Sequence, residues 1–189
     1  MKRKGIIFFV TLLIFFITAD LFASASRKRY FNRPQLGIWF GPLTPMFETG
    51  ETLEPALGAG AFFRYNTPID ELKIGFETSY QDYNSRGVDS LRLIPAYMDL
   101  VYLLPIDLPV RMQIKGGGGF CHVYMEPDDI RQWDPMLSTG LEISFPAGQM
   151  ANIALRIDYL FIYEGHIDGS KNNGHVINAG ISLYLNLNL

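Results

Sequence analysis

Cysteine and long apolar stretches are both scarce in this sequence of 189 residues. Cys121 is the only cysteine, so the chain can form neither an internal disulfide nor a cysteine-based zinc site. Beyond the first 25 residues, no apolar run approaches the ~20 residues that a membrane-spanning helix needs. An excess of basic residues is also lacking, since the formal net charge is −3, and nothing therefore indicates a nucleic-acid partner.

The sequence is nevertheless more apolar than that of most soluble proteins. Its mean hydropathy is +0.10, and 14% of its residues are aromatic, chiefly phenylalanine and tyrosine. Because this apolarity is not gathered into a helical span, it must be distributed along the chain in another pattern.

The N-terminus has the pattern of a secretory signal peptide. A basic start, Lys2 to Lys4, precedes an apolar stretch from Ile6 to Ala19. Ala23-Ser24-Ala25 then supplies small residues for cleavage. We therefore expect a signal peptide over 1–25 and a mature domain over 26–189. Because the basic run 27–29 directly follows the cleavage site, an uncleaved membrane anchor is the alternative.

The rest of the chain alternates apolar and polar residues with a period of two, which is typical of β-strands with two unlike faces. Turn-forming Gly, Pro, Asn and Asp bound these segments. A β-strand needs about 9–11 residues to cross a membrane, and each segment is close to or above this length. The eight predicted strands are 35–43, 56–65, 71–80, 91–104, 110–124, 136–145, 151–163 and 175–187.

The composition of the two faces indicates which one points inward. In 151–163, Ile153 and Ile157 belong to an apolar face, while Asn152 and Arg156 belong to a polar one. The polar faces are rich in Gly, Ser and Asn, which suits a crowded lumen. The apolar faces carry aliphatic residues flanked by Tyr and Phe, as at a membrane interface. We therefore predict an all-β fold, an eight-stranded antiparallel up-and-down barrel that spans a membrane.

The predicted connections alternate between short and long. The short ones are 66–70, 105–108 and 146–150, and the long ones are 44–55, 81–90, 125–135 and 164–174. Barrels of the bacterial outer membrane have an even number of strands, short periplasmic turns and longer outer loops. This order predicts that both termini lie in the periplasm.

The layout resembles the small eight-stranded outer-membrane barrels of the OmpA, OmpX and OmpW type. The C-terminal strand also resembles their assembly signal, through Asn178, Gly180, Leu183 and Leu185, although the chain ends in Leu189 rather than in an aromatic residue. The resemblance implies a monomer in the outer membrane, with its lipids and the barrel-assembly machinery as partners and no cofactor. The ligand of the surface loops, if there is one, is not indicated.

The predicted lumen collects charged residues, which in such a place must pair with one another. In 91–104, Leu91 and Leu93 fall on the same face as Asp99, so we place a bulge near Pro95 that turns Asp99 inward. A network of salt bridges that plugs the barrel is favoured, and a selective passage or a proton-linked site is the alternative. The predicted network comprises Arg64, Lys73, Glu77, Arg92, Asp99, Arg111, Lys115, Glu142, Arg156 and Asp158.

Other candidate sites receive less support. The glycines at 116–119 lack the Lys-Ser/Thr of a phosphate loop and more simply allow close packing, for example beside Trp39 or Tyr97. No catalytic residue is assigned, because Ser182 and His175 are predicted on opposite faces. A lipid-modifying enzyme is the least favoured function. His166 and His175 flank the last loop and are a weak candidate for a zinc or nickel site.

Two functions remain open from the sequence. The charged lumen favours an envelope-structural protein or one whose surface loops bind a partner. Passage of small or hydrophobic molecules, as the OmpW-like resemblance implies, is the alternative. A wall opening beside a proline, or a continuous apolar lumen, would favour passage.

Overall fold

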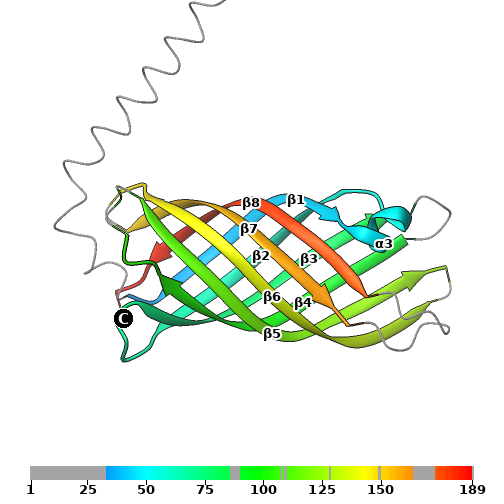
Figure 1. Cartoon of the computed structure of the whole chain (residues 1–189), viewed down its shortest axis with the longest axis horizontal. Helices are drawn as coiled ribbons and strands as arrows, with labels where there is room; N and C mark the ends of the chain where they lie inside the picture. Colours follow the sequence, from blue (N-terminus) through cyan, green and yellow to red (C-terminus); the bar gives the residue numbers. More distant parts are fainter. Residues whose placement is uncertain are drawn as a thin grey trace, which may run out of the picture.

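The structure, a computed structural model, describes residues 33–85, 90–106, 108, 110–127, 129–148, 150–163 and 173–188. Eight antiparallel strands follow one another around a single closed barrel (Figure 1). The expected signal peptide and its cleavage site lie outside the described residues, as does His166. The strands are β1 (Gln35–Pro45), β2 (Ala56–Asn66), β3 (Leu72–Asn84), β4 (Ser90–Leu103), β5 (Arg111–Glu126), β6 (Ile130–Pro146), β7 (Ala151–Ile162) and β8 (Gly174–Asn186).

Each strand pairs with the next, and β8 closes the barrel on β1. The closing register runs from Gln35↔Asn186 to Pro45↔Val176. Closure satisfies the backbone groups that an open sheet would leave unpaired at its edges. The predicted up-and-down antiparallel barrel of eight strands is confirmed. Among the described residues, no helix is long and apolar enough to cross a membrane.

The barrel is apolar outside and carries its buried charges inside, the reverse of a water-soluble barrel. Ile157 and Phe76 are 57% and 51% exposed, whereas Arg156 and Glu77, their neighbours in sequence, are each 1% exposed. Aromatic residues cluster on the outer surface towards both ends, as they do at the two interfaces of a membrane barrel. They include Phe63, Tyr65 and Tyr102 towards the end with the short turns, and Tyr80, Phe120, Trp133 and Tyr163 towards the other.

Glycines on the inner surface make room for large neighbours. A Cβ atom at Gly60 would collide with the Trp39 indole, and one at Gly119 would collide with Tyr97. Tyr97 therefore packs beside the glycine run as the sequence suggested, whereas Trp39 packs elsewhere. Glycine is needed at such places because an eight-stranded barrel is only just wide enough for its own side chains.

The bulge predicted near Pro95 is wrong. β3 and β4 keep one register from Leu72↔Tyr102 to Asn84↔Ser90, and β4 and β5 are paired without interruption. Asp99 does point inward, but Leu91 and Leu93 point inward with it. The physical reason is that the lumen is not polar throughout, so these two leucines can lie inside without a change of face.

Two of the four connections predicted to be long are shorter than predicted. β5 and β6 continue almost to their turn, which leaves only residues 127–129 between them, and β3 and β4 are joined by 85–89. Pro135 is tolerated within β6 because β6 pairs with β7 only from Met136 onwards, so the missing proline N–H costs no ladder bond. The barrel wall therefore rises highest at β5 and β6, the two longest strands.

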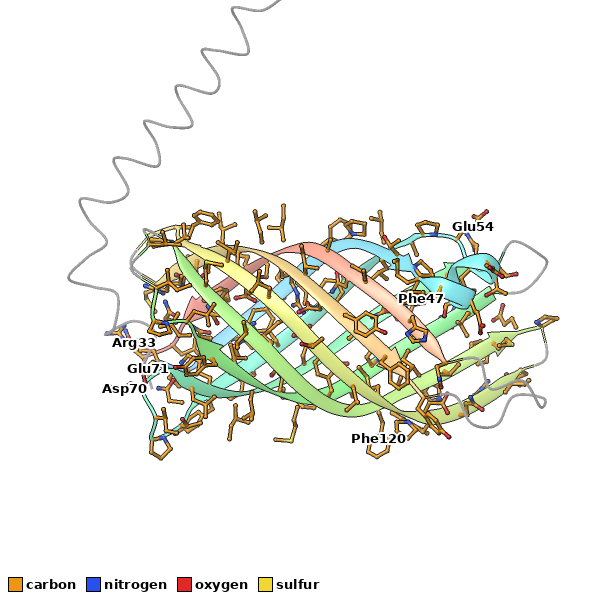
Figure 2. The ribbon with its side chains drawn as sticks, in the orientation of Figure 1. Arg33, Phe47, Glu54, Asp70, Glu71 and Phe120 are labelled. Carbon is orange, nitrogen blue, oxygen red and sulfur yellow. The ribbon has the colours of Figure 1, made fainter. Side chains whose placement is uncertain are left out.

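The end of the barrel at which β5 and β6 rise highest is called the loop end. The β1–β2 connection carries the short helix α3 (Phe47–Thr52) at this end (Figure 1). The Met46 amide donates to the His175 carbonyl of β8 at 2.8 Å, and Leu53 forms a bridge with Ser85 after β3. Leu53 is buried against the apolar residues inside the barrel. Arg33, Asp70 and Glu71 mark the opposite, turn end in Figure 2.

A closed barrel predicts heat-modifiable migration on detergent gels. Every strand edge is paired, so no strand can leave without breaking two ladders, and unfolding has a high barrier. We expect the folded, unboiled protein to migrate differently from the boiled protein, as measured by electrophoresis with and without heating. Identical mobility of a sample shown by circular dichroism to be β-rich would contradict the closed barrel.

Candidate functional site: the lumen

A bidentate ion pair crosses the middle of the lumen. Nη1 and Nη2 of Arg64 donate to the two carboxylate oxygens of Glu142 at 3.0 and 2.7 Å, and both side chains are fully buried. Arg64 lies on β2 and Glu142 on β6, four strands away in either direction around the barrel. The pair therefore connects opposite walls.

A second ion-paired group crosses the lumen in another direction. The guanidinium of Arg156 on β7 pairs with the carboxylates of Glu77 on β3 and of its neighbour Asp158. Lys115 on β5 adds its ammonium at 2.7 Å from Asp158 and 3.8 Å from Glu77. β3 and β7 are also opposite walls, so two sets of ion pairs brace the barrel. Pairing is what makes such deeply buried charges tolerable.

Aromatic rings pack on both guanidinium groups. Cζ of Arg64 lies 4.2 Å from the ring centroid of Phe62 and 5.8 Å from that of Tyr184, and Cζ of Arg156 lies 4.8 Å from that of Trp39. These distances allow cation–π attraction, which is stronger away from water. The rings also occupy the space beside the ion pairs, so charges and rings together fill the cross-section.

The remaining predicted lumen charges surround this centre. Towards the turn end, the Lys73 ammonium donates to the Arg33 carbonyl at 2.8 Å. Nη1 of Arg111 donates to Oδ1 of Asn152 at a long 3.4 Å. The Asp99 carboxylate lies against the backbone of Gly75, where a Cβ atom would collide with it. Nine of the ten predicted residues thus share the inner surface.

Arg92 is the exception, and its placement in the lumen was wrong. It lies on the outer face of β4 with Met98, and its guanidinium carbon is 5.6 Å from the ring centroid of Tyr80 and 5.5 Å from that of Tyr124. The error follows from the bulge at Pro95. Without a bulge, Arg92 and Asp99 lie an odd number of positions apart along β4 and must face opposite ways.

Towards the loop end, the inner surface becomes mostly apolar, with Gln81 and Asp134 as buried polar residues, a feature that the sequence interpretation missed. The signal was present, because Leu160 and Ile162 continue the face of Arg156, just as Cys121 and Val123 continue that of Lys115. The buried apolar residues of this half are Leu43, Leu53, Tyr83, Leu93, Cys121, Val123, Met136, Leu160, Ile162 and Val176.

The candidate metal and catalytic groups do not converge among the described residues. His175 lies on the outer face, where its Nδ1 is 2.6 Å from the Tyr159 hydroxyl and its ring contacts Phe47 and Phe161. Ser182 is buried on the inner face of the same strand. His166 lies outside the described residues, so the proposed pair with His175 stays a prediction.

The predicted assembly signal lies on β8. Asn178 and Gly180 face the lumen, while Leu183 and Leu185 face outward and are 48% and 46% exposed. Leu183 pairs with Ile38 and Leu185 with Leu36 on β1, so the signal borders the strand that closes the barrel. Recognition of these residues by an assembly machinery stays a prediction.

No protein-family model and no curated protein matches the chain. Solved structures do. The crystal structure of Neisserial surface protein A matches with a TM-score of 0.65 at 10% identity, over 82% of this chain and 97% of the other. The N-terminal β-barrel domain of Pseudomonas aeruginosa OprF matches with a TM-score of 0.53 at 16% identity, over 82% and 98%. The outer-membrane protein OprG of the same species matches with a TM-score of 0.50 at 13% identity, over 82% and 98%. The chain therefore has the fold of the small eight-stranded barrels of the bacterial outer membrane.

Proposed function

We propose that this chain is a monomeric outer-membrane protein with a structural or surface-binding role, whose barrel does not conduct. The observation that carries the proposal is the pair of braces across the lumen, Arg64 with Glu142 and Arg156 with Glu77. In this arrangement both termini lie in the periplasm, and the loop end faces outward. Membrane lipid and the barrel-assembly machinery are its proposed partners.

A plugged lumen leaves the outer rim as the part that can meet other molecules. At this rim the wall of β5 and β6 rises above its neighbours, and α3 covers the opposite side. Surface binding by such a rim needs no transport path. An enzymatic role is not proposed, because Ser182 and His175 point to opposite sides of one strand.

Passage of small hydrophobic molecules is the second candidate, and two observations favour it. The half of the lumen near the loop end is lined mostly by apolar residues, with Gln81 and Asp134 among them. The β3–β4 ladder also lacks pairs between Thr78↔Ala96 and Gln81↔Leu93, where Pro95 has no N–H to donate. Against it, the register is the same on both sides of this gap, so the wall is not displaced there.

Conductance of the refolded protein in planar bilayers tests the proposal. We expect no defined conductance steps from the wild type, because the braces and the rings beside them fill the cross-section. A variant that lacks both braces, with Arg64→Ala, Glu77→Ala, Glu142→Ala and Arg156→Ala, is the matched control. It should conduct, which shows that the refolded barrels insert.

Steps of equal size and frequency from the wild type and this control would contradict the plugged barrel. The second candidate is tested separately, by uptake of a hydrophobic fluorescent probe into vesicles that contain the silent wild-type protein. Uptake above that of protein-free vesicles would support passage of apolar molecules despite the absence of ion conduction.

A further inference from the structure

Charged residues on the outer surface of the strands are confined to one region. Within the described strands they are Asp82 on β3, Arg92 on β4, Glu126 on β5 and Arg131 on β6, all near the loop end. The described outer faces of β7, β8, β1 and β2 carry no Asp, Glu, Lys or Arg. The outward-facing arginines of the strands thus lie on one side of the loop end, whereas the other side carries, among its described residues, only the acidic residues Glu48, Glu51 and Glu54, in and after α3.

Two of these residues form a row with a tyrosine between them. Arg92 is the cross-strand partner of Tyr124, which in turn is the partner of Arg131. The guanidinium carbons of Arg92 and Arg131 lie 5.5 and 5.1 Å from the Tyr124 ring centroid. Their backbones are two strands apart, about 10 Å. Because arginine side chains are long, both guanidinium groups can reach one bound group above the ring.

The row lies at the boundary between apolar and charged surface. The next row of outward-facing residues, one step towards the middle of the barrel, is aromatic. It contains His122 and Trp133, whose ring centroids lie 4.9 Å apart in an edge-on arrangement. Beyond it, Phe120 projects from the wall and is 57% exposed (Figure 2). This order of charged, aromatic and apolar rows is that of a membrane interface, where lipid phosphates lie.

Each guanidinium group of the row has a carboxylate close to it. Asp82 on the outer face of β3 is the cross-strand partner of Arg92, and Nε of Arg92 is covered by its neighbours and has no hydrogen-bond partner among the described residues. Arg131 pairs with Asp129 at 3.0 Å, but the two side chains are 64% and 66% exposed, and ion pairs in water hold little free energy. A phosphate matches the fork of donors that an arginine presents and binds it more strongly than a lone exposed carboxylate does.

We propose that Arg92 and Arg131, on either side of Tyr124, bind the phosphate of a lipid headgroup in the membrane around the barrel. This inference rests on the proposed insertion of the barrel in a membrane. The site fixes the rotation and depth of the barrel relative to the headgroups, since it lies on one side only. Asp82 lies opposite Arg92, Glu126 follows Tyr124 on the outer face of β5, and Asp129 pairs with Arg131, so these three carboxylates compete with the phosphate and disfavour a second one.

The neighbouring Trp133 reports on this site. It is 62% exposed on the outer face, whereas Trp39, the other tryptophan, is buried in the lumen. Bromine on a lipid acyl chain quenches tryptophan fluorescence on contact, so brominated lipids can be compared directly. The probe is brominated phosphatidic acid, a phosphate monoester, mixed into phosphatidylcholine vesicles that contain the folded protein. Brominated phosphatidylcholine measures contact with ordinary lipid.

We expect phosphatidic acid to be enriched around Trp133 relative to phosphatidylcholine. The enrichment should fall about fivefold for each of Arg92→Gln and Arg131→Gln. The matched controls, Asp82→Asn and Asp129→Asn, should keep or increase it. Added inorganic phosphate should leave the quenching unchanged, because the lipid presents its phosphate at the level of the site. The gel-mobility assay verifies that each variant is folded.

Equal enrichment in the wild type and in both arginine variants would overturn the inference. The inference would also be overturned if the enrichment of phosphatidic acid depended on added calcium and were lost in the aspartate variants. The headgroup would then be held by a calcium ion bound to the carboxylates and not by the arginines. Failure of the proposed membrane insertion is distinguishable, since Trp133 would then not be quenched even by brominated phosphatidylcholine.

Discussion

We expect Ile157→Arg to lower the free energy of unfolding in phospholipid vesicles by about 2–4 kcal/mol. Ile157 lies in the middle of β7, faces outward and is 57% exposed, with the lumen residues Arg156 and Asp158 on either side of it in sequence. A guanidinium at this position would have to lie in hydrocarbon or bend away to reach water. Unfolding by urea, followed by tryptophan fluorescence, measures the change.

The same substitution at Ile69 is the matched control. Ile69 is 55% exposed, but it lies in the turn between β2 and β3, beyond the apolar wall. We expect Ile69→Arg to change the free energy of unfolding by no more than ~0.5 kcal/mol, as is usual at exposed sites. Equal losses at both positions would count against a lipid-facing wall. Asn152→Arg is less suitable as a control, because Asn152 is buried beside Arg111.

The orientation of most side chains could be predicted from the sequence because successive residues of a strand face opposite ways wherever no bulge intervenes. Arg156 and Ile157 illustrate this, since their faces follow from alternation alone. The interpretation failed where it also assumed a lumen that is polar throughout. That assumption turned Leu91 and Leu93 outward, required a bulge at Pro95, and moved Arg92 to the wrong side of the wall.

The partners of the lumen charges could not be predicted in the same way. Arg64 and Glu142 are separated by four strands, and their meeting depends on the tilt and stagger of the barrel, which alternation does not specify. The sequence therefore identified nine of the lumen charges but not the braces, and it missed the buried Asp134. The start of β6 was missed because Asp129 and Pro135 resemble loop residues and because 130–134 does not alternate apolar with polar residues, although burial does alternate along it in the structure.

The second large effect is expected at Glu142. Glu142→Leu leaves the guanidinium of Arg64 fully buried with only the weak 3.4 Å hydrogen bond to Gln113. Removing one partner of a buried ion pair costs about 3–5 kcal/mol, because the remaining charge is uncompensated. We expect a loss of this size in the free energy of unfolding, measured in vesicles with urea.

The double variant Arg64→Met with Glu142→Leu separates this charge effect from a loss of packing. It removes both charges and fills much of their volume with apolar atoms, so it should recover most of the stability, as replacements of whole buried pairs often do. Asp129→Asn, which breaks the exposed pair with Arg131, is the control and should cost no more than ~1 kcal/mol. If the double variant were as unstable as Glu142→Leu alone, the brace would matter through shape rather than charge. If Glu142→Leu were as mild as Asp129→Asn, water would reach Arg64, and the lumen would not be plugged at this level.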